Sequence, residues 1–210
     1  MANVIKEHNW SHLTTPVCNL QEEAGPLLAR VKERFEEVRS QLEVRASVTR
    51  DCSMMTMYCP DPFVESVKKY YGVDITEWMQ EPKFQPLMDH PSYIKWEVHD
   101  EELKQAVSKK FNYDPNRLEM LLHVMEPGQM GILHIDRHKG ADSPSGKPSV
   151  RHLIFFDDWA YGQSFQVGEE FIKWRAGDAF LTDEGGAPHG GANFGFNDRF
   201  VLRVTGEVLD

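Results

Sequence analysis

The sequence predicts a mainly β protein with additional helices, in which the strands of the C-terminal half form a sandwich or jelly roll. Two observations lead to this fold class. Seven short segments with strand character follow Pro115, and residues that favour turns separate them. Before Pro115, apolar residues recur mainly at helical spacing. No linker is long enough to split the chain, so we expect one domain over 1–210, with helices of a helical or mixed part (1–115) packed on the β part (116–210).

The N-terminal half begins with a predicted amphipathic helix over about residues 20–43. Its apolar residues repeat at steps of three and four, and charged residues stand between them. Asp100 is a typical N-cap residue and predicts a second helix that reaches about Phe111. Three further elements are expected here: an extended segment over 52–59, a short helix over 62–72 and a strand over 93–98.

The predicted strands of the C-terminal half are short, as in a jelly roll. Pro127-Gly128 stops the first of them, and Gly168 and Ala176-Gly177 mark later turns. A polar loop rich in Gly, Pro and Ser, 137–149, separates the second strand from the third. The strands are expected over 117–126, 130–136, 150–157, 164–168, 170–174, 178–182 and 198–208.

Composition excludes several classes of protein. The chain has 210 residues (24.2 kDa), of which 40% are hydrophobic and 11% aromatic, so it can form a packed core. Lys and Arg total 23 and Asp and Glu total 33, which gives a formal net charge of −10. An acidic chain without a long basic run argues against binding to the nucleic-acid backbone, although a local basic pocket remains compatible with it.

Cysteine usage and hydropathy bear on the compartment. Cys18, Cys52 and Cys59 form no CxxC pair, which argues against a disulfide framework and against a thiolate zinc site. No segment has the apolar length of a signal peptide or of a membrane span. We therefore expect a cytoplasmic protein without a membrane partner.

Three residues of the C-terminal half form a candidate metal site. His134 and Asp136 end one predicted strand, and residues i and i+2 of a strand point to the same face. His189 follows 55 residues after His134, just before the last strand. Two His and one carboxylate on one face of a metal, with other positions open, form the site of non-haem Fe(II) oxygenases. The pattern therefore predicts an iron site.

Two arginines lie on the last predicted strand. Arg199 comes ten residues after His189, and Arg203 has the same strand parity, so both should project from one face. Guanidinium groups bind carboxylates in a two-pronged way. Arg203 would then be a substrate contact or a structural ion pair. The alternative is a solvated arginine face, because apolar residues occupy the other face of this strand.

These residues also carry a resemblance to a known family. From Met120 to Thr205 the sequence resembles the 2-oxoglutarate- and Fe(II)-dependent dioxygenases, most closely the aspartyl/asparaginyl β-hydroxylase and proline-hydroxylase branch. The resemblance covers about 85 residues, roughly two fifths of the chain. The matching segments are Pro127-Gly128, His134-Ile135-Asp136, Arg151-His152-Leu153, Trp174 to Asp178, Pro188-His189 with Asn193, and Asp198 to Leu202.

The resemblance implies a double-stranded β-helix, a jelly roll whose open end holds the metal. It implies an Fe(II) site made of His134, Asp136 and His189. Arg199 would bind the distal carboxylate of the cosubstrate 2-oxoglutarate, and Arg151 would help to hold it. Such an enzyme uses O2 to hydroxylate an amino-acid side chain, free or in a protein or peptide, and releases succinate and CO2. Because some β-hydroxylases lack the carboxylate ligand, Asp136 places the chain nearer the proline hydroxylases and disfavours halogenation.

Two other functions fit the same residues. A zinc-dependent hydrolase could use His134, His138 and His189 with Asp136, but it gives the arginines no role. A jelly roll could also serve as a non-catalytic binding module, for example a lectin-like or sensor domain.

Substrate selection is expected at the loop 137–149 and in the helical half, because loops at the mouth of a scaffold carry specificity. His123 and His152 flank apolar residues on strands and are expected to be core or rim residues. The aromatic candidates for substrate contact are Trp78, Trp96, Tyr70 and Tyr71.

Overall fold

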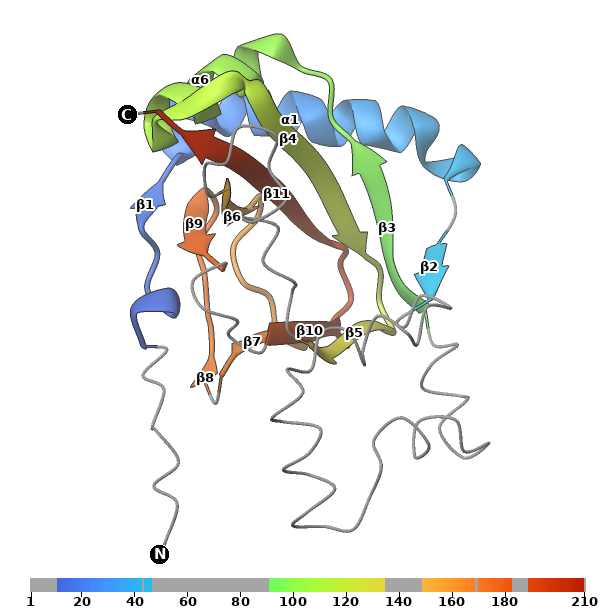
Figure 1. Ribbon diagram of the computed structural model, residues 1–210. Coiled ribbons are helices and arrows are strands. Elements are labelled where there is room, and N and C mark those ends of the chain that lie inside the picture. Colours follow the sequence, from blue (N-terminus) through green and yellow to red (C-terminus); the bar gives the residue numbers. More distant parts are fainter. Residues whose placement is uncertain are drawn as a thin grey trace, which may run out of the picture.

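Two antiparallel β-sheets form the body of the structure (Figure 1). This computed structural model describes residues 11–42, 44–46, 91–134, 149–168, 170–182 and 189–209. The larger sheet has seven strands in the order β1-β9-β6-β11-β4-β3-β2, and the smaller sheet has four in the order β5-β10-β7-β8. From β4 onward the chain crosses repeatedly between the two sheets, which is the arrangement of a double-stranded β-helix. The predicted fold class is confirmed.

Most of the described elements lie where the sequence patterns placed them, although several bounds differ by a few residues. The larger sheet consists of β1 (Cys18–Asn19), β2 (Val44–Ala46), β3 (Pro91–Glu97), β4 (Tyr113–Met125), β6 (Ser149–Phe155), β9 (Asp178–Leu181) and β11 (Arg199–Val208). The smaller sheet consists of β5 (Gln129–His134), β7 (Gln163–Val167), β8 (Glu170–Phe171) and β10 (His189–Asn193). The described helices are α1 (Gln21–Val38), α6 (Glu101–Phe111) and the short 3-10 helices η1 (Ser11–Leu13) and η2 (Arg39–Gln41).

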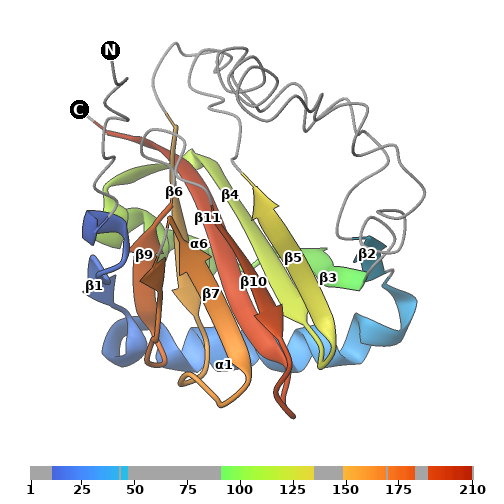
Figure 2. The same cartoon turned by 90° about the horizontal axis from the view of Figure 1, so that it is seen from below.

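Helix α1 lies across the outer face of the larger sheet, together with α6 (Figures 1 and 2). The buried residues Ala24, Leu28, Val31 and Phe35 follow one another at steps of three and four, so they form one stripe along the helix. This stripe belongs to the main core beneath the helices. The amphipathic pattern predicted this helix, and burial of the stripe supplies most of the stability that a surface helix needs.

Helix α6 begins at the residue that the sequence indicated. The side chain of Asp100 accepts a hydrogen bond of 3.0 Å from the backbone N–H of Leu103, as an N-cap residue should. Asn112 ends the helix in the left-handed conformation, with φ at 56°. Arg30 of α1 donates to both carboxylate oxygens of Asp100, at 2.9 and 2.7 Å. The cap therefore also ties the two helices together.

The last strand, β11, has both of its faces covered. Phe200, Leu202 and Val204 belong to the core beneath the helices. Arg199 and Arg203 have the opposite parity and line a cavity between the two sheets. The predicted shared face of the arginines is thus confirmed, and the alternative that this face is solvated is wrong.

A second core fills part of the space between the sheets. Phe155 of β6 stacks on Trp174 with ring centroids 4.1 Å apart. Phe180 of β9 packs edge-on against the ring of Phe155. Phe165 of β7 contributes from the smaller sheet. These packed aromatic rings set the separation of the two sheets. The cavity lies beside them, and Phe155 and Phe165 form part of its wall.

Some elements differ from the predictions. Strand β10 was not predicted, because its sequence His-Gly-Gly-Ala-Asn lacks the residues typical of strands. Strands β1 and β2 were also not predicted, and β8 has two residues where a strand over 170–174 was expected. The predicted elements over 52–59 and 62–72 lie outside the described residues. No helix in the described part of the chain combines the length and the hydrophobicity needed to span a membrane.

Candidate functional site

A cavity of about 120 Å³ between the two sheets gathers the basic residues that the sequence singled out. Its wall includes three arginines and two histidines, and among the described residues it includes no Asp or Glu. In a chain with a net charge of −10, this is a local concentration of positive charge. The basic members of the wall are Arg151, Arg199, Arg203, His123 and His189.

The cavity runs along the strands between two ends. At the turn end, residues 126–128 join β4 to β5, and residues 194–198 join β10 to β11. At the histidine end, β5 stops at His134 and β10 begins at His189. Arg199 pairs in register with Met125 at the turn end. Arg203 lies four residues further along β11, roughly 13 Å nearer the histidine end.

The two predicted histidine ligands occupy opposed positions on neighbouring strands. The backbone of His189 pairs directly with that of His134 across β10 and β5, and a β-bulge follows His189. Directly opposed residues of an antiparallel pair have Cα atoms about 4.5–5.5 Å apart. His189 is buried, with 9% of its surface exposed. The side chain of His134 and the whole of Asp136 lie outside the described part of the chain.

Arg199 is a buried cation in the wall of this cavity. Its exposed fraction is 8%, and its Nη1 donates to the backbone carbonyl of Ser164 on β7. Its Nε is buried and has no hydrogen-bond partner, and no carboxylate of the described residues pairs with it. Burial lowers the pKa of Arg199 to about 10, so it remains charged at neutral pH. A buried charge without a counter-ion is costly, and binding of an anion would relieve that cost.

Asn193 holds the connection that leads into Arg199. It is fully buried, and its Nδ2 donates to the carbonyls of Met125 and Asn197 at 2.6 and 2.8 Å. Its Oδ1 accepts from the N–H of Gly195 at 3.1 Å. These bonds fix the loop between β10 and β11, and hence the position of Arg199 relative to His189. The sequence match included Asn193 without giving it a role.

The other two predicted arginines line the same cavity nearer the histidine end. The Nη2 of Arg203 donates to Oε2 of Glu119 at 2.7 Å. Arg151 is buried, with 8% exposed, and its backbone carbonyl accepts from the N–H of Thr182 at 3.1 Å. Arg151 also lies opposite Thr205 of β11. The structure therefore brings all three predicted arginines together with His189.

Tyr93 and His123 are among the residues of the cavity wall that were not predicted as site residues. The ring of Tyr93 on β3 stacks on His123 of β4, with centroids 4.5 Å apart and an interplanar angle of 23°, and both line the cavity. His123 shares strand parity with Met125, which also lines the cavity, so parity could have indicated it.

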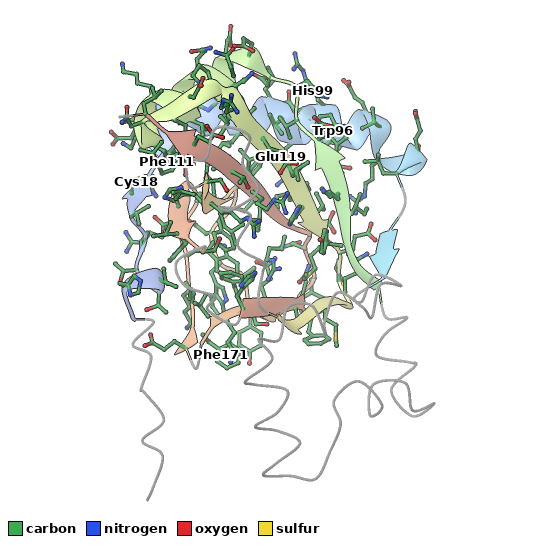
Figure 3. The ribbon with its side chains drawn as sticks, viewed as in Figure 1. Cys18, Trp96, His99, Phe111, Glu119 and Phe171 are labelled. Carbon is green, nitrogen blue, oxygen red and sulfur yellow. The ribbon has the colours of Figure 1, made fainter. Side chains whose placement is uncertain are left out.

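Two sequence candidates lie elsewhere. Trp96 packs against Phe35 of α1, with centroids 6.2 Å apart, on the helix side of the larger sheet (Figure 3). Trp96 therefore does not line this cavity. His152 is buried against the ring of Phe111, and its Nδ1 lies 2.6 Å from the hydroxyl of Tyr113. It is the core residue that the sequence predicted.

The described side chains contain no group of three or more His, Cys, Asp or Glu residues that could hold a metal ion. The predicted triad is not part of that set, because two of its members have side chains outside the described residues. His138 of the zinc hypothesis, and Trp78, Tyr70 and Tyr71, also lie outside them.

Comparison with known proteins gives structural matches alone. No protein-family model matches the chain, and no curated protein sequence matches it. A predicted oxalate decarboxylase from Thermotoga maritima matches with 18% identity and a TM-score of 0.36, over 55% of this chain and 81% of that chain. A protein with a double-stranded beta-helix domain from Klebsiella pneumoniae matches with 16% identity and a TM-score of 0.36, over 55% and 77%. A cupin 2 conserved barrel domain protein from Salinispora arenicola matches with 14% identity and a TM-score of 0.34, over 55% and 76%.

Proposed function

We propose that this protein is an Fe(II)- and 2-oxoglutarate-dependent dioxygenase. It would hydroxylate an amino-acid side chain, free or within a protein or peptide, and release succinate and CO2. The observation that carries the proposal is Arg199, a buried guanidinium without a carboxylate partner among the described residues, in the same cavity as His189. A buried guanidinium with a free donor is suited to bind one end of a dicarboxylate.

The metal would be held by His134, Asp136 and His189. Support comes from the sequence spacing and from the register that pairs the backbones of His134 and His189. Two imidazoles and one carboxylate form the ligand set that non-haem Fe(II) oxygenases use. Bound Fe(II) with 2-oxoglutarate and O2 would supply the oxidising chemistry.

The chain itself would bind, orient and exclude water. Arg199 would hold the distal carboxylate of 2-oxoglutarate at the turn end of the cavity. The apolar wall between there and the histidine end, which includes Leu153, Phe155 and Val201, would keep water away from the cosubstrate. Arg151 would provide a second positive charge for the cosubstrate, as the family resemblance implies.

An anaerobic titration tests the proposal. Addition of Fe(II) and then 2-oxoglutarate should produce a weak visible charge-transfer band, which arises when the keto acid chelates iron. The band should require much more 2-oxoglutarate in Arg199→Met than in Arg175→Met, a control that removes an exposed arginine. Succinate release should then be screened against free amino acids and against peptides.

The outcomes separate the candidate functions. A wild-type protein that binds Fe(II) but shows neither the band nor a change in thermal stability with 2-oxoglutarate would overturn the proposal. A zinc hydrolase would bind Zn(II) without any dependence on 2-oxoglutarate. A non-catalytic binding module would release no succinate with any substrate.

A further inference from the structure

Arg203, which lines the cavity, forms an ion pair with Glu119. The donor Nη2 of Arg203 lies 2.7 Å from Oε2 of Glu119, and the exposed fractions of the two side chains are 21% and 52%. We propose that the substrate carries a carboxylate, which replaces Glu119 on Arg203 when the substrate binds. This inference rests on the proposed function and deepens it, because it names the substrate class for the same cavity.

The distribution of positive charge supports this class. Arg199 lies at the turn end of the cavity, where one carboxylate of the cosubstrate would use its charge. Arg151 and Arg203 lie nearer the histidine end and line the same cavity. The proposed cosubstrate site uses Arg199 and Arg151, so Arg203 is the arginine of this cavity wall that the cosubstrate leaves for another ligand. A carboxylate of the substrate would suit that position.

The cavity wall contains buried polar atoms without a hydrogen-bond partner. The Nε of Arg203 is buried and has no hydrogen-bond partner, and neither has Oγ1 of Thr182, which lines the cavity. A buried donor that is left unpaired costs about 1–3 kcal/mol. A carboxylate has two acceptor oxygens and can bind a guanidinium through two hydrogen bonds. An incoming carboxylate could therefore satisfy donors that Glu119 leaves unpaired.

Glu119 is suited to be exchanged. It lies on β4, beside β11 (Figure 3), in register with Thr205. More than half of its side chain is exposed. Exposed ion pairs contribute about 0–1 kcal/mol, so little is lost when Glu119 leaves. The stacked rings of Tyr93 and His123 form the adjoining wall and could contact the apolar part of an amino acid.

The experiment uses metal-free protein saturated with 2-oxoglutarate. The probes are the twenty free amino acids and their α-amides, and binding is measured by calorimetry. We expect at least one amino acid to bind about tenfold or more tightly than its amide. In Arg203→Gln this preference should disappear. In Glu119→Gln the amino acid should bind about two- to fivefold more tightly, because its competitor is gone.

The test includes a matched control and results that would overturn the proposal. Glu97→Gln removes an exposed carboxylate of β3 and should change neither affinity. The proposal is overturned if no amino acid binds better than its amide, or if Glu119→Gln weakens the binding of the acid. It is also overturned if Arg203→Gln weakens the binding of 2-oxoglutarate as much as it weakens the binding of the amino acid, because Arg203 would then belong to the cosubstrate site.

Failure of the subsite can be told apart from failure of the proposed function. If the acid binds better than the amide in a way that depends on Arg203, but no charge-transfer band forms on addition of Fe(II), the carboxylate subsite is supported and the dioxygenase activity is contradicted. Equal succinate release with acids and with amides would support the dioxygenase activity and contradict the carboxylate subsite.

Discussion

Gly191 of β10 lies directly against the guanidinium of Arg199. A Cβ atom at residue 191 would come within 2.8 Å of Nη1 and 3.1 Å of Nη2 of Arg199, and within 2.6 Å of the carbonyl oxygen of Ser164. That same carbonyl accepts a hydrogen bond from Nη1. The missing side chain at Gly191 therefore provides the space in which Arg199 reaches its acceptor and lines the cavity.

Gly191→Ala should weaken the binding of 2-oxoglutarate. The added methyl group would move the guanidinium away from Ser164 and out of its place in the cavity wall. Loss of a charge-assisted hydrogen bond costs about 1.5–3 kcal/mol, which corresponds to a loss of affinity of about 10- to 150-fold. Calorimetry on the metal-free protein measures this loss, and thermal unfolding measures the accompanying loss of stability.

Ser164→Ala is the matched control for this variant. It removes the hydroxyl that accepts a bond of 3.1 Å from the N–H of Ala192, but it keeps the carbonyl that Arg199 uses. Its affinity for 2-oxoglutarate should stay near that of the wild type. Wild-type affinity in Gly191→Ala would show that the guanidinium can bind its anion from another position.

Arg199→Met should make the unliganded protein more stable and unable to bind 2-oxoglutarate tightly. The guanidinium is buried without a counter-ion, and replacing buried charges with apolar side chains can stabilise a protein by about 1–4 kcal/mol. Urea unfolding with and without 2-oxoglutarate tests both effects. The ligand at 100 times its dissociation constant should stabilise the wild type by about 2.7 kcal/mol and the variant far less.

Arg199→Lys separates charge from shape. It keeps the positive charge but loses the planar fork, so its affinity for 2-oxoglutarate should lie between those of the wild type and Arg199→Met. Arg203→Lys should affect 2-oxoglutarate less, because Arg203 lies roughly 13 Å further along the strand. A larger effect at Arg203 than at Arg199 would place the distal carboxylate at the other end of the cavity.

His134→Ala and His189→Ala should each lose most of their Fe(II) binding, because two protein ligands remain. The register that pairs these two backbone positions is the structural reason to expect the same result from both. The measurement is the iron content after anaerobic loading and desalting. His99→Ala, which removes a largely exposed imidazole of the same chain, should keep the wild-type stoichiometry. Full stoichiometry in either of the first two variants would contradict the triad.

Local signals predicted much of the fold. Asp100 identified the start of α6, because an N-cap acts through its own helix. The alternation on β11 predicted that Arg199 and Arg203 share a face, because strand parity is a local property. Both faces of β11 are covered because the helices lie on one side and the smaller sheet on the other. Strand parity alone could not show whether the arginine face is covered or solvated.

Non-local pairing explains what the sequence missed. The residues His189 to Asn193 have little strand propensity, and they form β10 because β5 and β7 pair with them on both sides. Tyr93 and His123 meet in the cavity wall because β3 pairs with β4 in one particular register. No local motif encodes that register, so the stacked pair could be found in the structure alone.

His152 makes the fold sensitive to acid. It is buried beside Phe111 and Tyr113, and burial lowers its pKa to about 4. In the unfolded chain a histidine has a pKa of about 6.5. Between these two values the unfolded state binds more protons than the folded state, so stability falls as the pH falls through this window. Above pH 6.5 the imidazole is neutral in both states and contributes no pH dependence.

His152→Gln should therefore flatten the acid limb of the stability curve. The wild type should lose about 2–3 kcal/mol more than this variant between pH 7 and pH 4.5, because each pKa unit is equivalent to about 1.4 kcal/mol. The glutamine amide can still meet the hydroxyl of Tyr113, which now lies 2.6 Å from Nδ1, but it does not titrate. Urea unfolding at the two pH values gives the comparison. Equal losses of stability in the two proteins would mean that folding does not lower the pKa of His152.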